Sequence, residues 1–133
     1  MIDIESQIFT MLSELLEAQF PGILVTNEHL NASSVFPCVS ITESDNYMPA
    51  SNLDTSGEQR FNVVMYEISG YSNKKAGRRA ECREIIRAVD TKLYSMNFTR
   101  LSMTPVPNLF NASIYRITAR YRAEIDGQYI YRR

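Results

Sequence analysis

Residues 111–125 read NASIYRITARYRAEI, and this stretch decides the fold. From position 115 to position 125 the odd-numbered residues are aromatic, aliphatic or small, whereas the even-numbered residues between them are polar. Successive side chains of a β-strand point to opposite faces of a sheet, so a period of two predicts a strand with one apolar and one polar face. The polar face carries Arg116, Arg120 and Arg122, and these three residues are called the arginine face below.

Asp126-Gly127 follows this strand, and the dipeptide favours a two-residue hairpin turn that pairs Ile125 with Gln128. The same register predicts three further pairs, which are Glu124 with Tyr129, Ala123 with Ile130, and Arg122 with Tyr131. Tyr129 and Tyr131 then join the arginine face, where Arg122 is expected to lie against a ring. So long a hairpin must bend or project, and we expect a projecting C-terminal hairpin that needs a neighbour.

The remaining chain has the patterns of two helices and several strands. Apolar residues at helical spacing predict amphipathic helices over residues 3–20 and 74–96, which end at Pro21-Gly22 and at Asn97. Alternating or continuous apolar residues predict strands at 23–26, 36–43, 58–69 and 98–104. The run at 58–69 is apolar on both faces, which favours the middle of a sheet, and a turn is expected after it at 69–73.

This order of elements predicts an α+β fold with one mixed or antiparallel sheet and two helices packed on it. No repeat or linker divides the chain, so residues 1–133 are expected to form a single domain. A content of 44% hydrophobic and 22% charged residues argues against global disorder. No apolar run approaches the ~20 residues of a membrane helix, and the acidic N-terminus does not resemble a signal peptide. We therefore expect a protein made in the cytoplasm with no membrane partner.

Residues 44–57, SDNYMPASNLDTSG, are rich in polar and turn-forming residues and predict a long loop. Long loops in small domains are often functional. Tyr47, Met48 and Leu53 are the larger apolar residues in this loop, and exposed apolar tips suit contact with a partner. The same side chains can instead fold back over the core, and the sequence leaves both interpretations open.

Catalytic and metal-binding motifs are absent from the sequence. It contains no GxSxG, Walker, GxGxxG, HExxH or EF-hand pattern, and its one histidine, His29, lies in a polar stretch typical of solvated loops. Cys38 and Cys82 are far apart in sequence, which argues against a zinc site and favours free thiols. We therefore predict no cofactor, no metal and no enzymatic activity. A small enzyme with a carboxylate site that no motif reveals stays as an alternative.

Basic residues gather in two places, although the net charge is only -1. One is the start of the second helix, where positive charge opposes the helix dipole and suits either an acidic partner or a solvated face. Its members are Lys74, Lys75, Arg78, Arg79 and Arg83. The other is the arginine face, whose like charges repel unless negative groups lie opposite. These groups can be carboxylates of a neighbouring subunit, passing phosphates, or Glu58, Glu67 and Glu124 of the same chain. A nucleic-acid-binding module is therefore another alternative.

Three stretches resemble the small tail-terminator (tail-completion) proteins of long-tailed phages. They are FPCVSITE at 36–43, AVDTKLYSMNFTR at 88–100 and NASIYRITARYRAEIDGQYIYRR at 111–133. The likeness extends over the whole chain in the order of its elements. It implies a mixed sheet flanked by helices and a hexameric ring of identical subunits seated on the last ring of the tail tube.

In that family the ring stops tube growth, presents a surface to the neck or head-closure protein, and lets DNA pass through its lumen without reading its sequence. The resemblance thus implies a structural virion protein of the tail and neck, assembled in the host cytoplasm. Tyr47, Met48 and Leu53 would contact the tube or a neighbouring subunit. The arginine face, with Tyr129 and Tyr131, would lie at a subunit boundary or near the lumen. A head-closure or other connector protein of the neck is the alternative within this class.

Overall fold

The computed structural model describes residues 3–28, 35–48, 61–107, 113–126 and 131–132, and it confirms the α+β fold with helices packed on a sheet. The elements, in chain order, are α1 (Glu5–Gln19), β1 (Leu24–Thr26), β2 (Cys38–Tyr47), β3 (Phe61–Ser72), α2 (Arg78–Ser95), β4 (Thr99–Pro105), β5 (Tyr115–Asp126) and β6 (Tyr131–Arg132). None of the helices in this part of the chain is long and apolar enough to cross a membrane.

The strands form one mixed sheet in the order β1-β2-β3-β5-β4, and β6 adds a short pairing to β5. The β1–β2 pair is parallel, and the other pairs are antiparallel. β3 lies in the middle of the sheet, as its apolar sequence predicts, and it pairs with β5 over twelve residues. The lateral margins of the sheet are therefore β1 on one side and β4 on the other.

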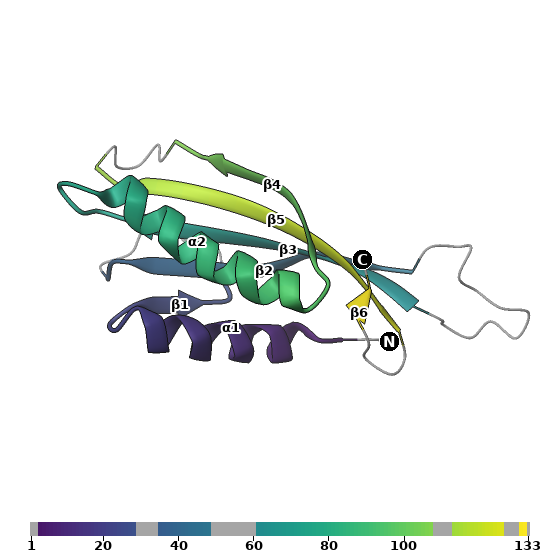
Figure 1. Ribbon diagram of the computed structural model, residues 1–133. Helices are drawn as coiled ribbons and strands as arrows, with labels where there is room; N and C mark the ends of the chain where they lie inside the picture. The colour runs from purple at the N-terminus through teal and green to yellow at the C-terminus, as the bar shows by residue number, and fades with distance from the viewer. Residues whose placement is uncertain (1–2, 29–34, 49–60, 108–112, 127–130, 133) are drawn as a thin grey trace, which may run out of the picture.

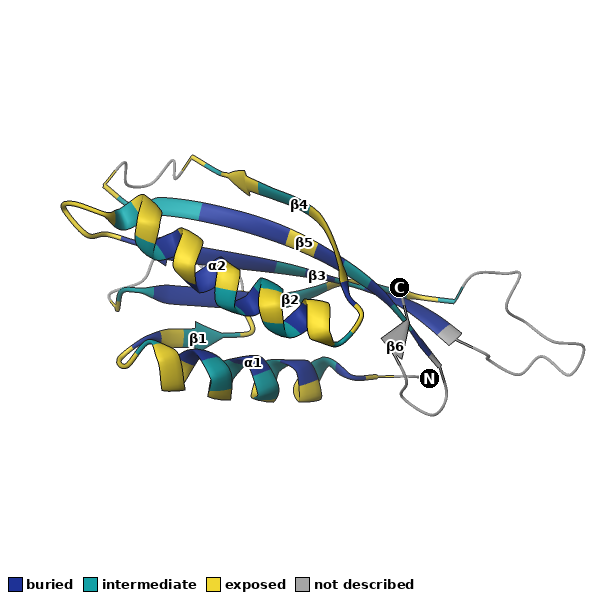
Figure 2. Cartoon of the chain, in the orientation of Figure 1, coloured by how far each residue is buried: buried dark blue, intermediate teal, exposed yellow. Residues whose placement is uncertain are grey.

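Both helices lie on the same face of the sheet, with α1 beside β1 and α2 across the middle strands (Figure 1). The sides of the helices that face the sheet are buried, whereas their outer sides are exposed (Figure 2). The buried helical residues are Ile8, Leu12, Leu16, Cys82, Ile85, Ile86, Val89 and Leu93. Full burial of each large aliphatic side chain stabilises the fold by roughly 1.5–3 kcal/mol, so these two stripes anchor both helices on the sheet.

β5 has the predicted alternation. Its odd-numbered residues from Ile117 to Ile125 are buried toward the helices, where Tyr66 also meets Phe98 edge-on with ring centroids 6.0 Å apart. Its even-numbered residues lie on the opposite face, which neither α1 nor α2 covers (Figure 1). The sheet therefore has a helix-covered face and a face that carries the arginines.

Two strands are longer than the sequence predicts. Residues 44–47, expected to begin a long loop, belong to β2, where a bulge between Glu43 and Asp45 lets the ladder continue opposite β3. β3 runs through the expected turn at 69–73 as far as Ser72, because its last residues pair with both β2 and β5. In both places cross-strand hydrogen bonds override the local preference of polar residues and glycine for turns.

The C-terminal hairpin has a different register from the predicted one. β6 pairs Tyr131 with Ile125 and Arg132 with Glu124, so the predicted pairing of Tyr131 with Arg122 is wrong. β5 ends at Asp126 and β6 begins at Tyr131, and this register does not fit a two-residue turn at Asp126-Gly127. β5 itself pairs with β3 along its whole length. β3 of the same sheet thus supplies the neighbour that the long strand β5 needs.

The second helix begins at Arg78, four residues later than expected, because Gly77 adopts a left-handed conformation with φ +82°. A residue with a Cβ rarely adopts this conformation, so the glycine separates the helix from Lys74 and Lys75. Asn97 has φ 68° and ends the helix as predicted. The basic start of the helix is therefore reduced to Arg78, Arg79 and Arg83, with Glu81 in the first turn.

Candidate functional site: the arginine face of the sheet

The arginine face is built from two neighbouring strands of the sheet. Residues directly opposite each other in an antiparallel pair share a face. The register places Arg120 opposite Glu67, Arg116 opposite Tyr71, and Arg122 opposite Met65. The face therefore brings the arginines of β5 onto one carboxylate and one aromatic ring of β3.

Glu67 is the central acceptor of this face, and most of its side chain is buried. One of its carboxylate oxygens lies 3.5 Å from Nε of Arg120, and the other lies 3.9 Å from Nη2 of Arg116. Two guanidinium groups thus share one carboxylate. The side chain of Arg120 is 59% exposed, so of the two arginines it is the one that a partner can reach.

Arg116 has a further set of contacts on β3. Its guanidinium lies over the Tyr71 ring, with Cζ 5.4 Å from the ring centroid, and its Nη2 donates a hydrogen bond of 3.3 Å to Oγ of Ser69. The hydroxyls of Ser69 and Thr118 lie 2.9 Å apart beneath it. Nε of Arg116 is buried without a hydrogen-bond partner among the residues that the structure describes. Arg116 is consequently a structural member of the face.

Arg122 pairs along its own strand, with Nη2 3.3 Å from Oε1 of Glu124. Among the sources of negative charge that the sequence leaves open, Glu67 and Glu124 of the same chain are therefore in use, and Glu58 lies outside the described residues. Three arginines meet two carboxylates, so these five side chains keep one formal positive charge. That charge is accessible mainly at Arg120.

The other predicted contact residues are only partly brought to this face. Tyr47 pairs with Val63, which in turn pairs with Glu124, so Tyr47 is in the same row as Glu124 two strands away. Its ring is exposed at the end of β2, and Met48 beside it is half-buried. Leu53 and Tyr129, like His29, lie outside the described residues. Tyr131 lies in β6 opposite Ile125.

Three carboxylates that the sequence does not connect meet at the start of α1. Asp3, Glu5 and Glu43 have carboxylate oxygens within 4.8 Å of one another, and they are the one group in the described part of the chain with a spacing that could hold a metal ion. Desolvation and the nearby charges of Glu5 and Asp3 raise the pKa of Glu43, while hydrogen bonds from Tyr66 and Asn46 oppose that rise. Hard cations accept such oxygen ligands.

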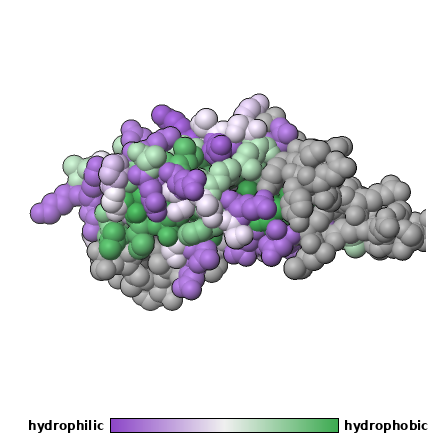
Figure 3. Space-filling model, turned by 90° about the horizontal axis from the view of Figure 1, so that it is seen from below, coloured by the Kyte–Doolittle hydropathy of each residue, from purple (hydrophilic) through white to green (hydrophobic). Residues whose placement is uncertain are grey.

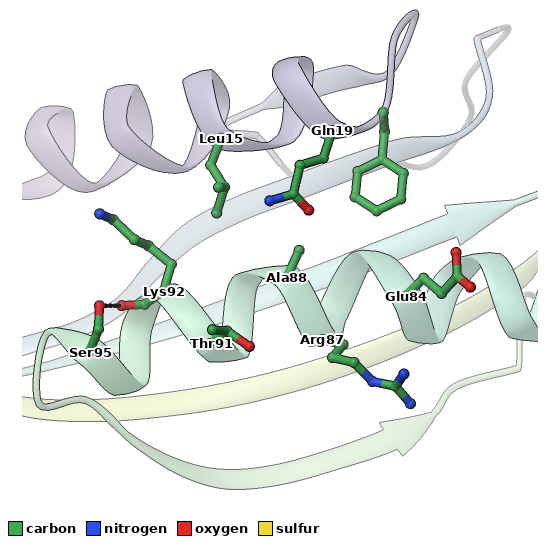
Figure 4. Close-up of a pocket in the computed structure, with 9 residues that line it drawn as sticks. Leu15, Gln19, Glu84, Arg87, Ala88, Thr91, Lys92 and Ser95 are labelled. Carbon is green, nitrogen blue, oxygen red and sulfur yellow. Dashed lines mark hydrogen bonds between the residues drawn. The ribbon is translucent and has the colours of Figure 1, made fainter.

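A groove of about 520 Å³ runs between α1 and α2 on the outer side of the molecule (Figure 4). Leu15 and Phe20 form its apolar wall on the α1 side. Lys92 reaches across from α2, and its carbonyl accepts a 2.6 Å hydrogen bond from the Ser95 hydroxyl. Arg87 points away from α1. The mixture of apolar and charged side chains is typical of a shallow groove between two surface helices.

The buried tyrosine and thiol near α2 serve the structure. Tyr121 donates a 3.0 Å hydrogen bond to Asp90, and burial together with the charge of Asp90 raises its pKa well above the ordinary value. Burial, with a smaller contribution from Glu81, raises the pKa of Cys82 to about 12. The Cys82 thiol donates to the carbonyl oxygens of Gly70 and Tyr115, at 3.6 Å and 3.5 Å. Neither group is ionised at neutral pH, and both cysteines are free, as predicted.

Sequence reasoning found the arginine face and offered Glu67 as one of its partners, but it missed the contacts of Arg116 with Tyr71 and Ser69. The period of two in β5 places Arg116 correctly, but Tyr71 falls in a segment whose composition predicts a turn. The contact between Asp90 and Tyr121 joins α2 to β5. A single sequence carries no signal for such contacts between distant segments.

The fold and this site define a class, which is an α+β protein whose sheet has one face covered by helices and one face bearing paired arginines and carboxylates. Comparison of the chain with models of known protein families and with curated proteins found no match.

Proposed function

We propose that the chain is a structural ring subunit, and specifically the tail terminator of a long-tailed phage, which caps the tail tube and joins it to the neck. The three stretches of resemblance in the sequence support this proposal. The observation that carries it is the position of the exposed apolar side chains.

The exposed large hydrophobic side chains of the described residues are spread over the molecule and do not gather in one place. Leu24 lies in β1 and Val35 precedes β2, whereas Tyr94 and Leu101 lie on α2 and β4, where they are 63% and 49% exposed. The remaining one, Tyr47, lies at the end of β2. A small-molecule site would gather such side chains in one pocket. Apolar groups on both sides suit a subunit with a neighbour on each side.

A ring built in this way acts mechanically. Interfaces that join different surfaces of neighbouring copies close on themselves when the rotation between copies completes a circle. The closed ring matches the end of the tube on one side and offers no further site for tube subunits on the other. DNA passes through the lumen without contacts that read its sequence.

The test uses tail tubes of the phage that encodes the chain. Purified protein is incubated with these tubes and imaged by negative-stain electron microscopy, while further tube growth is followed by light scattering. We expect rings at one end of each tube and arrested growth at that end. A protein that neither forms rings nor binds tube ends would contradict the proposal, and binding to the head-side connector in place of the tube would assign it as a head-closure protein.

A further inference from the structure

Charge is divided unevenly along the chain. Residues 1–73 contain ten acidic residues and a single basic residue, Arg60, whereas residues 74–133 contain five acidic and thirteen basic residues. The two parts nearly cancel, which is why the net charge of -1 conceals the division. Such asymmetry between halves points to an interaction of the charged surfaces.

The fold turns this division along the sequence into a division in space. The acidic part supplies α1, β1, β2 and β3, and the basic part supplies α2, β5 and β4. Because the strand order is β1-β2-β3-β5-β4, the strands of the acidic part form one half of the sheet and the strands of the basic part form the other half. α1 and β1 form one margin of the molecule, and β4 forms the opposite margin (Figure 1).

The acidic margin consists of Glu14 and Glu17 on α1 and Glu28 after β1. All three are exposed, and α1 contains no basic residue. None of them takes part in an ion pair among the described residues. Hydrophilic side chains lie beside apolar ones on this side of the molecule (Figure 3). The margin therefore offers negative charge that the described part of the chain leaves unpaired.

The surface called the basic margin is a stripe of α2, the helix that lies across the middle strands, and not part of β4. It consists of Arg79, Arg83 and Arg87, which are exposed and follow one another at four-residue intervals. Like charges at this spacing destabilise a helix, so the stripe has a cost to the isolated molecule. None of the three forms an ion pair among the described residues, and Arg87 points away from α1 (Figure 4). Among the described residues, these three arginines thus do not pair with the acidic margin of their own copy.

We propose that the acidic margin of one copy binds the basic margin of the next. The occupant of each margin is a second copy of this chain, because the two surfaces complement each other in charge while Arg87 points away from α1 within one copy. Tyr94 and Leu101 on one side, and Leu24 on the other, supply the apolar part of the contact. The charges orient it and speed encounter. The contact joins different surfaces, so its closure into a ring rests on the proposed function.

Two double variants test this contact. Glu14→Lys/Glu17→Lys makes both margins of the chain basic, and Arg83→Glu/Arg87→Glu makes both acidic. By light scattering after size exclusion, each variant alone should associate at least about tenfold more weakly than the wild type. An equimolar mixture should regain association, because every contact then joins a basic to an acidic margin. Rising salt should weaken the wild-type assembly.

Controls separate this contact from general effects of charge. Asp45→Lys changes the net charge as much as Glu14→Lys, but Asp45 is exposed on β2, away from both margins, so only Glu14→Lys should weaken association. The rescue by mixing also shows that the variants are folded. Unchanged association of either double variant alone, or a mixture that stays dissociated, would overturn the proposal. Loss of DNA binding without loss of association in the Arg83/Arg87 variant would assign the basic margin to nucleic acid and overturn it too.

The outcome is independent of the tube-binding test. Charge-dependent rings that ignore tail tubes would leave this contact standing and contradict the tail-terminator function. Rings that cap tail tubes but assemble equally well in the double variants would support the tail-terminator function and contradict this contact.

Discussion

Glu67 is the residue on which the arginine face depends. It is the only carboxylate that the described residues place against Arg116 and Arg120, and it is mostly buried between them. Removing its charge leaves two guanidinium groups close together, and Nε of one of them is buried without a hydrogen-bond partner among the described residues. An uncompensated, partly buried charge costs more than the pair contributes when intact.

We therefore predict that Glu67→Gln lowers the free energy of unfolding by about 1–2 kcal/mol, since the site is only partly buried. Urea denaturation at neutral pH and low protein concentration measures this change. The matched control is Glu124→Gln, which removes the carboxylate of a single, more exposed pair with Arg122 and should cost less than about 1 kcal/mol. Equal losses in the two variants would show that Glu67 has no special role.

The charge of Glu67 stabilises the fold, whereas ionisation of Glu43 destabilises it, because the folded-state pKa of Glu43 is raised above 4.5. In the pH range just above 4.5 the folded protein binds more protons at this site than the unfolded chain. Stability therefore falls as pH rises through that range. Glu43→Gln removes the charge and retains an oxygen that accepts from Tyr66, so it should raise the urea midpoint at pH 7 and flatten the pH dependence.

The control for Glu43 is Glu14→Gln, which removes a carboxylate from the exposed outer side of α1. Denaturation series from pH 4 to pH 8 compare the two variants with the wild type. A Glu43→Gln protein whose stability follows the wild-type curve in parallel would show that burial and the nearby charges of Glu5 and Asp3 do not raise the pKa of Glu43.

At the scale of elements, local pattern predicts some features of the fold and misses others for a physical reason. The alternation in β5 and the apolar run in β3 are strong signals, and both strands lie where these signals predict. The polar end of β2 and the Ser69–Ser72 segment of β3 have the composition of turns. They form strands only because neighbouring strands supply their hydrogen bonds.

The hairpin register and the contact of Arg116 with Tyr71 show the same limit, whereas Glu67 is among the partners that the sequence offers for the arginines. Asp126-Gly127 correctly indicates that the chain returns along β5, but the register of Ile125 with Tyr131 differs from the one that a two-residue turn requires. Tyr71 and Glu67 meet the arginines through the β3–β5 register, which joins segments about fifty residues apart. Contacts at that separation leave no periodic trace in one sequence.

The arginine stripe of α2 gives a prediction for a single helix. Arg83 has a like charge four residues away on each side, so Arg83→Glu replaces two repulsions by two attractions. We expect the monomer to become more stable by about 0.5–1 kcal/mol at low salt, even though the same change weakens association. Thermal denaturation at concentrations below assembly measures the gain, and it should shrink in high salt. A destabilised monomer would mean that Arg83 makes a favourable contact within its own chain.

At the scale of the whole molecule, the strand order decides what the charge division does. The two parts of the sequence differ in charge, and the order β1-β2-β3-β5-β4 keeps the strands of the acidic part together in one half of the sheet and those of the basic part in the other. With the two parts interleaved, the charges would cancel locally and leave no reason for association. The partner surface is thus a property of topology, and sequence patterns alone do not predict it.

Opposite margins also restrict the composition of a mixed assembly. When the Glu14→Lys/Glu17→Lys and Arg83→Glu/Arg87→Glu variants are mixed, each contact must join one variant to the other, so the two alternate around a ring. An alternating ring closes only with an even number of subunits, and the proposed hexamer meets this condition with equal numbers of the two. Native mass spectrometry of the equimolar mixture should therefore show hexamers of equal composition alone. A random distribution of compositions would mean that the two margins do not meet across the subunit interface. This conclusion would hold whether or not the ring binds tail tubes.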